Sequence, residues 1–148
     1  MKNVYLAYGS NLNLEQMTYR CPDATVIGTT VLPDYRLVFR GGRHSGVATI
    51  EQEKGSAVPV LLWEITRRCE QALDRYEGYP HLYRKEQLTV DLDGREVQAM
   101  AYVMNAGPPP AMPGAYYYAT ILHGYRDCGF DEAILKQAVM DITGTFND

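Results

Sequence analysis

The sequence has no excess of positive charge and no long hydrophobic run. Its 14 lysines and arginines are outnumbered by 18 aspartates and glutamates, which gives a formal net charge of −4. Affinity for nucleic acid depends on neutralising phosphates with cationic side chains, so we expect no nucleic-acid partner. No apolar stretch approaches the ~20 residues that cross a bilayer, and the apolar run after Met1-Lys2-Asn3 is too short for a secretory signal. We therefore expect no membrane partner.

Cysteine and histidine are scarce as well. The three cysteines, Cys21, Cys69 and Cys128, are odd in number and far apart. This pattern argues against a disulfide framework, and against zinc, which favours closely spaced ligand pairs. The three histidines at positions 44, 81 and 123 show no metal-ligand spacing either. We therefore expect three reduced thiols, a cytoplasmic location and no bound metal.

Tyrosine, by contrast, is abundant, with twelve copies against one tryptophan and three phenylalanines. Several of them cluster at positions 76, 79 and 83, and again at 116–118. Because a tyrosine joins an apolar ring to a hydroxyl group, such clusters fit either a half-buried core or a polar pocket lined by rings. The composition leaves both interpretations open.

The 148 residues are expected to form a single domain over residues 1–148, with 46% hydrophobic residues, as in a typical globular protein. Periodicity and turn residues predict a strand, a helix, several antiparallel strands, a helix, a hairpin and two helices, which is typical of an α+β fold. Short strands around one strongly apolar strand predict a sheet that curls toward a barrel. The expected strands are 4–8, 26–32, 36–40, 47–50, 58–65, 88–92 and 97–103, and the expected helices are 14–19, 67–77, 118–125 and 132–142.

The first strand ends in Tyr8-Gly9-Ser10-Asn11-Leu12, which we call the first loop, and a helix is predicted to follow at once with Asn13 as its cap. Three interpretations are open. The loop is a plain turn, or its backbone amides hold an anion near the positive end of the helix, or Ser10 is a nucleophile. The last needs a nearby base, and the surroundings do not match G-x-S-x-G.

Glu77 is the second candidate, within LDRYEG at the end of a helix that Thr66 caps and Gly78 terminates. It lies one turn after Leu73 and so borders the apolar stripe. Partial burial and the negative end of the helix dipole both raise the pKa of a carboxyl group. A raised pKa suits a general acid or base, whereas a fully solvated surface glutamate is the plainer alternative.

Taken in order along the chain, these segments resemble the gamma-glutamylcyclotransferase family. No single motif is specific, but the ordered set covers nearly the whole chain, and the segments after Leu73-Asp74 look more like bacterial members. The matching motifs are Tyr8-Gly9-Ser10-Asn11-Leu12, Gly46-Val47-Ala48-Thr49-Ile50, the Trp63 strand, Leu73-Asp74-Arg75-Tyr76-Glu77-Gly78, Tyr102-Val103-Met104 and Pro113-Gly114-Ala115-Tyr116.

The resemblance implies an α+β fold with a mixed, largely antiparallel barrel-like sheet. It implies an enzyme that releases 5-oxoproline from a gamma-glutamyl amino acid or amine, because the substrate's own amino group attacks its side-chain amide. It implies no cofactor and no metal, and a small-molecule substrate as the partner. Glu77 matches the family's catalytic acid/base, and the substrate-binding positions fall on Tyr8, Gly9, Ser10, Asn11, Leu12, Tyr83 and Tyr116.

Two other functions remain open beside this one. The chain could be a non-catalytic module that binds a small gamma-glutamyl or carboxylate ligand, or a serine hydrolase that uses Ser10. The sequence does not specify the leaving amine or amino acid, the pathway, whether the protein is a monomer or a homodimer, or which amides bind a carboxylate and which an oxyanion.

Overall fold

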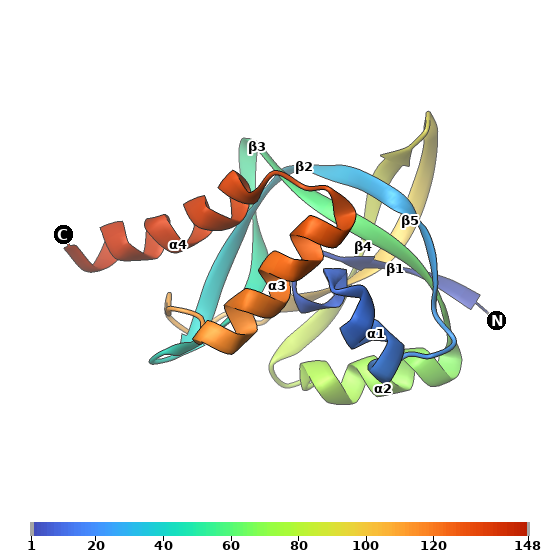
Figure 1. Cartoon of the computed structure of the whole chain (residues 1–148), viewed down its shortest axis with the longest axis horizontal. Coiled ribbons are helices and arrows are strands. Elements are labelled where there is room, and N and C mark those ends of the chain that lie inside the picture. The colour runs from blue at the N-terminus through green and yellow to red at the C-terminus, as the bar shows by residue number, and fades with distance from the viewer. Residues whose placement is uncertain (1, 148) are drawn as a thin grey trace.

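The centre of the molecule is the short strand β1, on which the rest of a five-stranded sheet is assembled in the order β2-β3-β1-β5-β4. The computed structural model describes residues 2–147 and is shown in Figure 1. β1 pairs antiparallel with β3 and parallel with β5, so the sheet is mixed and largely antiparallel, as predicted. The strands are β1 (Lys2–Ala7), β2 (Thr25–Gly42), β3 (Ser45–Thr66), β4 (Tyr83–Leu92) and β5 (Arg95–Met104).

The sheet curls until its two edge strands approach each other. The Thr30 hydroxyl on β2 donates a hydrogen bond to the Asp91 carbonyl on β4. β4 and β5 form the predicted hairpin, with Asp93 and Gly94 both at positive φ in its turn. The expected barrel-like α+β architecture is therefore confirmed.

β2 and β3 are longer than the sequence pattern indicated. Residues 26–32 and 36–40 were expected as separate strands joined through Pro33-Asp34, but they form one continuous strand with a register shift between Pro33 and Tyr35. Asp34 takes positive φ (64°) at this bulge, so the chain bends without leaving the sheet. Residues 47–50 and 58–65 likewise belong to one strand, β3, in which residues 53–56 lie between the pair Tyr35 and Gln52 and the pair Pro33 and Ala57, opposite Asp34. β2 and β3 therefore form one long, bent hairpin.

The first two helices begin at the predicted caps, whereas the last two extend beyond the expected ranges 118–125 and 132–142. Asn13 Oδ1 accepts a hydrogen bond from the Gln16 amide (3.0 Å), and Thr66 Oγ1 accepts one from the Cys69 amide (3.1 Å). Gly78 ends the second helix in the left-handed conformation. No helix within residues 2–147 has the length and apolar character needed to span a membrane. The helices are α1 (Leu14–Arg20), α2 (Arg67–Glu77), α3 (Ala115–Cys128) and α4 (Glu132–Asn147), with a 3-10 turn η1 (Ser10–Leu12) before α1.

The cysteines differ from the expectation of three reduced thiols. Cys21, at the end of α1, and Cys69, in the first turn of α2, form a disulfide, and only Cys128 is free. The wide sequence separation of 48 residues hid this pair, because the fold brings the two helices together. The argument from reduced thiols to a cytoplasmic location therefore fails for two of the three residues, and the location stays a prediction.

Helix α3 packs directly on the first loop, and a glycine makes this approach possible. A Cβ atom at Gly124 would lie 2.7 Å from the Leu12 carbonyl carbon and 2.7 Å from the Asn13 nitrogen. The Asn13 side-chain amide also donates to the Thr120 carbonyl of α3 (3.1 Å). Helix α3 therefore packs against the first loop, and Figure 1 shows α3 beside α1.

We expect Gly124→Ala to destabilise the protein, although alanine normally stabilises a helix interior by about 1 kcal/mol relative to glycine. The added methyl group would overlap backbone atoms, so α3 would have to move away from the first loop. Thermal unfolding should show a lower Tm. The matched control is Ala119→Gly at an exposed position of α3, where propensity alone should cost about 1 kcal/mol. A raised Tm in Gly124→Ala would contradict the close packing.

Candidate active site

The first loop, the end of α2 and the start of α3 enclose a pocket against β3 and β5. We call it the candidate pocket; its volume is about 220 Å³. It brings together six of the predicted site residues, from segments far apart in the sequence, and seven others. The lining residues are Tyr5, Tyr8, Gly9, Ser10, Asn11, Val47, Ala48, Tyr76, Glu77, Leu82, Tyr83, Tyr102 and Tyr117.

Glu77 is the last residue of α2, so its carboxyl group lies where the helix stops at the pocket. The side chain is half-buried, and no hydrogen bond or ion pair joins its carboxyl group to another residue in the described part of the chain, 2–147. Burial raises its pKa to about 7, while the positive charge of Arg20 acts in the opposite direction. Near neutral pH, the group can therefore both accept and release a proton.

A second carboxylate on the same helix has a different role. The Tyr102 hydroxyl donates to Asp74 Oδ1 (2.6 Å), and Lys85 Nζ lies 3.0 Å from Asp74 and 2.7 Å from Glu70. These contacts tie α2 to strands β4 and β5. Asp74 is thus paired and structural, whereas Glu77, one turn later, is unpaired and faces the candidate pocket.

The first loop is a 3-10 turn with a short set of internal bonds. The Leu12 amide donates to the Gly9 carbonyl (3.0 Å) and the Asn13 amide to the Ser10 carbonyl (3.1 Å). The amides of Ser10 and Asn11 precede these bonds and have no acceptor within the turn. Leu12 was expected to bind substrate, but its amide is taken and its side chain is fully buried, so it belongs to the core.

Asn11 fixes the conformation of the loop. Its Nδ2 donates to the Tyr5 hydroxyl (2.9 Å), its Oδ1 accepts from Arg20, and its carbonyl accepts from the Trp63 indole (3.1 Å). With both ends of the side chain engaged, Asn11 contributes its backbone to the candidate pocket. The rigid loop therefore keeps its amides in one orientation.

Tyrosine hydroxyls hold the opposite wall. Tyr83 donates to the Ala48 carbonyl (2.6 Å), and Tyr117 accepts from the Ala48 amide (3.0 Å). Tyr8 donates to the Tyr102 carbonyl (2.6 Å). Burial raises the pKa of each of these phenols above its usual range, so they stay neutral near pH 7. The wall is polar at its tips but uncharged.

The structure places Tyr116 outside the candidate pocket and the residue after it inside. Its side chain is 79% exposed and does not line the candidate pocket, whereas the neighbouring Tyr117 does. The helical period contains the signal that sequence reasoning missed, because Tyr117, Ile121 and Gly124 lie on one face of α3. Counting from the buried Ile121 would have selected Tyr117.

Sequence reasoning missed Arg20, which lies close to the candidate pocket and contacts Tyr76 and Asn11 of its lining. Its guanidinium lies 3.7 Å from the centre of the Tyr76 ring, and it donates to Asn11 and to Gln16 Oε1 (3.0 Å). The Tyr76 hydroxyl in turn hydrogen-bonds Ser10 Oγ (3.1 Å). Arg20 thus connects α1, the first loop and α2, and it places a positive charge near Glu77. Its spacing of four residues from Gln16 indicated only the contact between those two side chains.

Within residues 2–147, no histidine contacts the Ser10 hydroxyl. That hydroxyl contacts Tyr76, and all three histidines are exposed and lie outside the lining of the candidate pocket. Within the described residues, no group of three or more His, Cys, Asp or Glu side chains could hold a metal ion. The chemistry available to the candidate pocket is proton transfer by Glu77 beside a loop of backbone donors.

Comparison with known proteins identifies relatives of the whole chain. The family described as "Gamma-glutamyl cyclotransferase, AIG2-like" matches residues 5–119. The human protein named gamma-glutamylcyclotransferase is 30% identical over 158 aligned positions, which cover 98% of this chain and 84% of the human protein. The bovine protein of the same name is 30% identical over 136 positions, covering 85% of this chain and 71% of its own length.

Solved structures agree with these matches. A structure described as gamma-glutamyl cyclotransferase superimposes with a TM-score of 0.83 at 26% identity, covering 93% of this chain and 86% of the other. A structure of YkqA from Bacillus subtilis, at 19% identity, shares the fold with a TM-score of 0.78 and is covered over 54% of its length. The chain belongs to the gamma-glutamylcyclotransferase family.

Proposed function

We propose that this protein is a gamma-glutamylcyclotransferase, which releases 5-oxoproline from a gamma-glutamyl amino acid or a gamma-glutamyl amine. The observation that carries the proposal is the unpaired carboxyl group of Glu77, with its pKa raised to about 7, inside a tyrosine-lined pocket that also contains the first loop. The family membership and the 30% identity to proteins of that name support it.

The reaction needs no nucleophile from the protein. The α-amino nitrogen of the gamma-glutamyl unit attacks its own side-chain carbonyl carbon, which forms the five-membered ring, and the bond from that carbon to the leaving nitrogen breaks. Two protons pass from the attacking ammonium group to the leaving nitrogen, and Glu77 can relay both. It takes the first before the attack and the second from the ring nitrogen of the tetrahedral intermediate, and it gives each to the leaving nitrogen, which departs as an ammonium group. A single carboxyl group with a pKa near 7 can serve both steps.

The remaining residues position the substrate. Holding the glutamyl chain in a nearly cyclic shape can contribute about 7–11 kcal/mol to lowering the barrier. The free amides of Ser10 and Asn11 either bind the substrate's α-carboxylate or stabilise the tetrahedral oxyanion. A donor of the second kind typically contributes about 2.7–4 kcal/mol. Tyr83 and Tyr117 hold the Ala48 backbone that forms the facing wall.

Glu77→Gln should fold normally and lose about 10²–10⁴-fold in turnover, because the amide can neither accept nor supply the proton. Release of 5-oxoproline from a panel of gamma-glutamyl dipeptides and amines, followed by mass spectrometry, measures the effect. The control is Glu15→Gln, which alters an exposed carboxylate of α1 outside the candidate pocket and should keep full activity.

Two results would contradict the role of Glu77. Near-normal turnover by Glu77→Gln would exclude it as the acid/base, and labelling of Ser10 by a serine-reactive phosphonate with loss of activity would identify a hydrolase instead. Thermal stabilisation by 5-oxoproline, without turnover of any compound in the panel, would identify a binding module.

The pH profile should depend on Arg20. The base must be deprotonated to act, so kcat/KM should rise with pH through an apparent pKa of about 7. Arg20 lowers the pKa of Glu77, so Arg20→Met should raise that pKa and move the acidic limb of the profile to higher pH. Arg20→Lys keeps the charge and should leave the limb near its original position. An unmoved limb in Arg20→Met would show that this charge does not act on Glu77.

A further inference from the structure

A second and larger cleft lies on the other side of the wall that closes the candidate pocket. We call it the charged cleft; its volume is about 650 Å³, within the usual range for small-molecule sites. Adjacent residues belong to the two different spaces: Ala48 and Tyr83 line the candidate pocket, whereas Thr49 and Arg84, which follow them in the sequence, line the charged cleft. Its lining comes from β2, β3, β4, the end of β5 and the loop 105–109.

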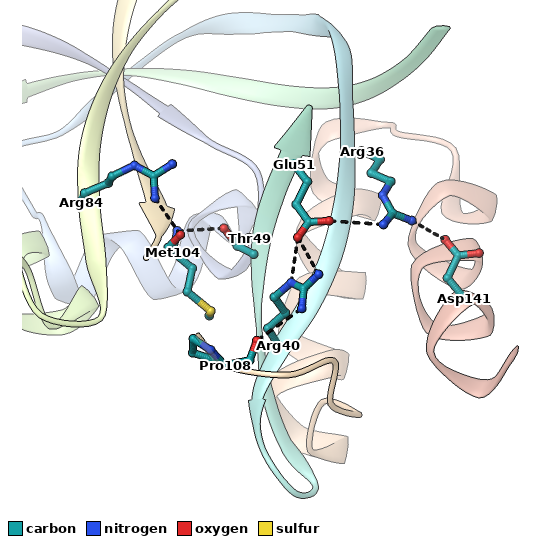
Figure 2. Close-up of polar contacts among 8 residues, drawn as sticks. All are labelled: Arg36, Arg40, Thr49, Glu51, Arg84, Met104, Pro108 and Asp141. Atoms are coloured by element: carbon teal, nitrogen blue, oxygen red, sulfur yellow. Dashed lines mark hydrogen bonds and ion pairs between the residues drawn. The ribbon is translucent and has the colours of Figure 1, made fainter. Parts of the chain in front are cut away.

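Two arginines from different strands line the charged cleft, and Figure 2 shows the polar contacts of both. Arg40 of β2 donates to Glu51 (2.8 Å) and to the Pro108 carbonyl (3.3 Å). Arg84 of β4 donates to the Met104 carbonyl (2.9 Å). Each guanidinium thus donates to a backbone carbonyl, which holds it in place. Because a guanidinium has five N–H donors, each also retains donors for a ligand. Fixed guanidiniums of this kind suit a carboxylate.

Carboxylates lie beside both guanidiniums. Glu51 pairs with Arg40 (2.7 Å) and also with Arg36 (3.2 Å), which in turn approaches Asp141 of α4 (3.9 Å). Glu86 pairs with Arg84 (3.2 Å). The formal charges of the two arginines and two glutamates that line the charged cleft cancel, so a simple anion or a simple cation meets repulsion as well as attraction. A ligand that carries both charges can satisfy both.

The floor of the charged cleft is apolar. Ile50, Val103 and Met104 are buried there, with 2%, 4% and 6% of their surfaces exposed, and Pro108 and Pro109 form part of the rim. An apolar side chain placed on this floor would gain about 25 cal/mol for each Å² that it removes from water. The lining therefore combines charges of both signs with a hydrophobic surface.

We propose that the charged cleft is a second binding site, separate from the candidate pocket, for a small zwitterion with an apolar side chain, namely a free amino acid or a dipeptide. Its carboxylate binds Arg40 or Arg84, its ammonium group binds Glu51 or Glu86, and its side chain packs on Ile50 and Met104. The site does not depend on the activity proposed for the candidate pocket.

The wall gives such a ligand a direct connection to the candidate pocket. Thr49 Oγ1 accepts a hydrogen bond from the Met104 amide (2.9 Å), and both residues line the charged cleft. Ala48, the next residue on β3, holds Tyr83 and Tyr117 on the other side. The backbone of residues 48–49 is thus shared, and a ligand on one side contacts the strand that shapes the other.

Binding can be tested by amide NMR titration of the full chain with L-leucine and glycyl-L-leucine. We expect saturable shifts at residues 49, 84 and 104 in the millimolar range. Isocaproate and isoamylamine retain the leucine side chain but carry one charge each, and both should bind at least about tenfold more weakly, since each loses a charge-assisted contact. Isocaproate binding as tightly as L-leucine would make this an anion site and overturn the proposal.

Variants locate the site. Arg40→Gln and Arg84→Gln should each weaken binding about tenfold or more, while Arg95→Gln, at an exposed position outside the cleft, should not. Arg84 is largely exposed, so its loss should leave the fold intact, which an unchanged Tm would verify. Glu77→Gln should bind normally. Binding that is lost in Glu77→Gln but kept in both arginine variants would place the ligand in the candidate pocket and overturn the proposal, as would the absence of saturable shifts.

Discussion

The geometry of the candidate pocket depends on one side chain, Tyr76, which joins three segments at once. Its ring lies under the Arg20 guanidinium at 3.7 Å, and its hydroxyl bonds Ser10 at 3.1 Å. The end of α1, the first loop and the end of α2 therefore cannot move independently. The disulfide between Cys21 and Cys69 joins the same two helices one residue beyond Arg20 and close to the start of α2. Together these contacts connect the first loop to the helix that carries Glu77.

The electrostatics of α2 follow from how its acidic residues are paired. Glu70 and Asp74 face β4 and share the ammonium group of Lys85, so their charges are compensated. Glu77 has no such partner within residues 2–147 and lies among neutral phenols, which cannot offset the loss of water around a carboxylate. The same helix thus carries acidic groups that fasten it to the sheet and one whose proton is exchangeable near neutral pH.

The sequence alone was sufficient to predict the capped starts of α1 and α2, the end of α2 and the hairpin turn, because these features depend on residues that are close together in the chain. Asn13, Thr66 and Gly78 set the helix ends, and Asp93-Gly94 set the hairpin, because caps and tight turns need particular residues. The proximity of Glu77 to the first loop was available only through resemblance to a family. The β2–β3 arm was misjudged because Pro33-Asp34 looks like a turn and is a bulge within a paired strand. The Cys21–Cys69 pair and Arg20 could not be predicted, since both depend on how α1 meets α2 in space.

The Thr66 hydroxyl caps the start of the helix that carries Glu77, and Gly78 ends the helix in the left-handed conformation. Each helical residue adds a rotation of about 100° and a rise of about 1.5 Å. Inserting a single residue between these two markers would swing the terminal carboxyl group away from the tyrosines while Asp74 stayed anchored. The length of this helix therefore determines which way the Glu77 side chain points, and so whether its carboxyl group faces the candidate pocket.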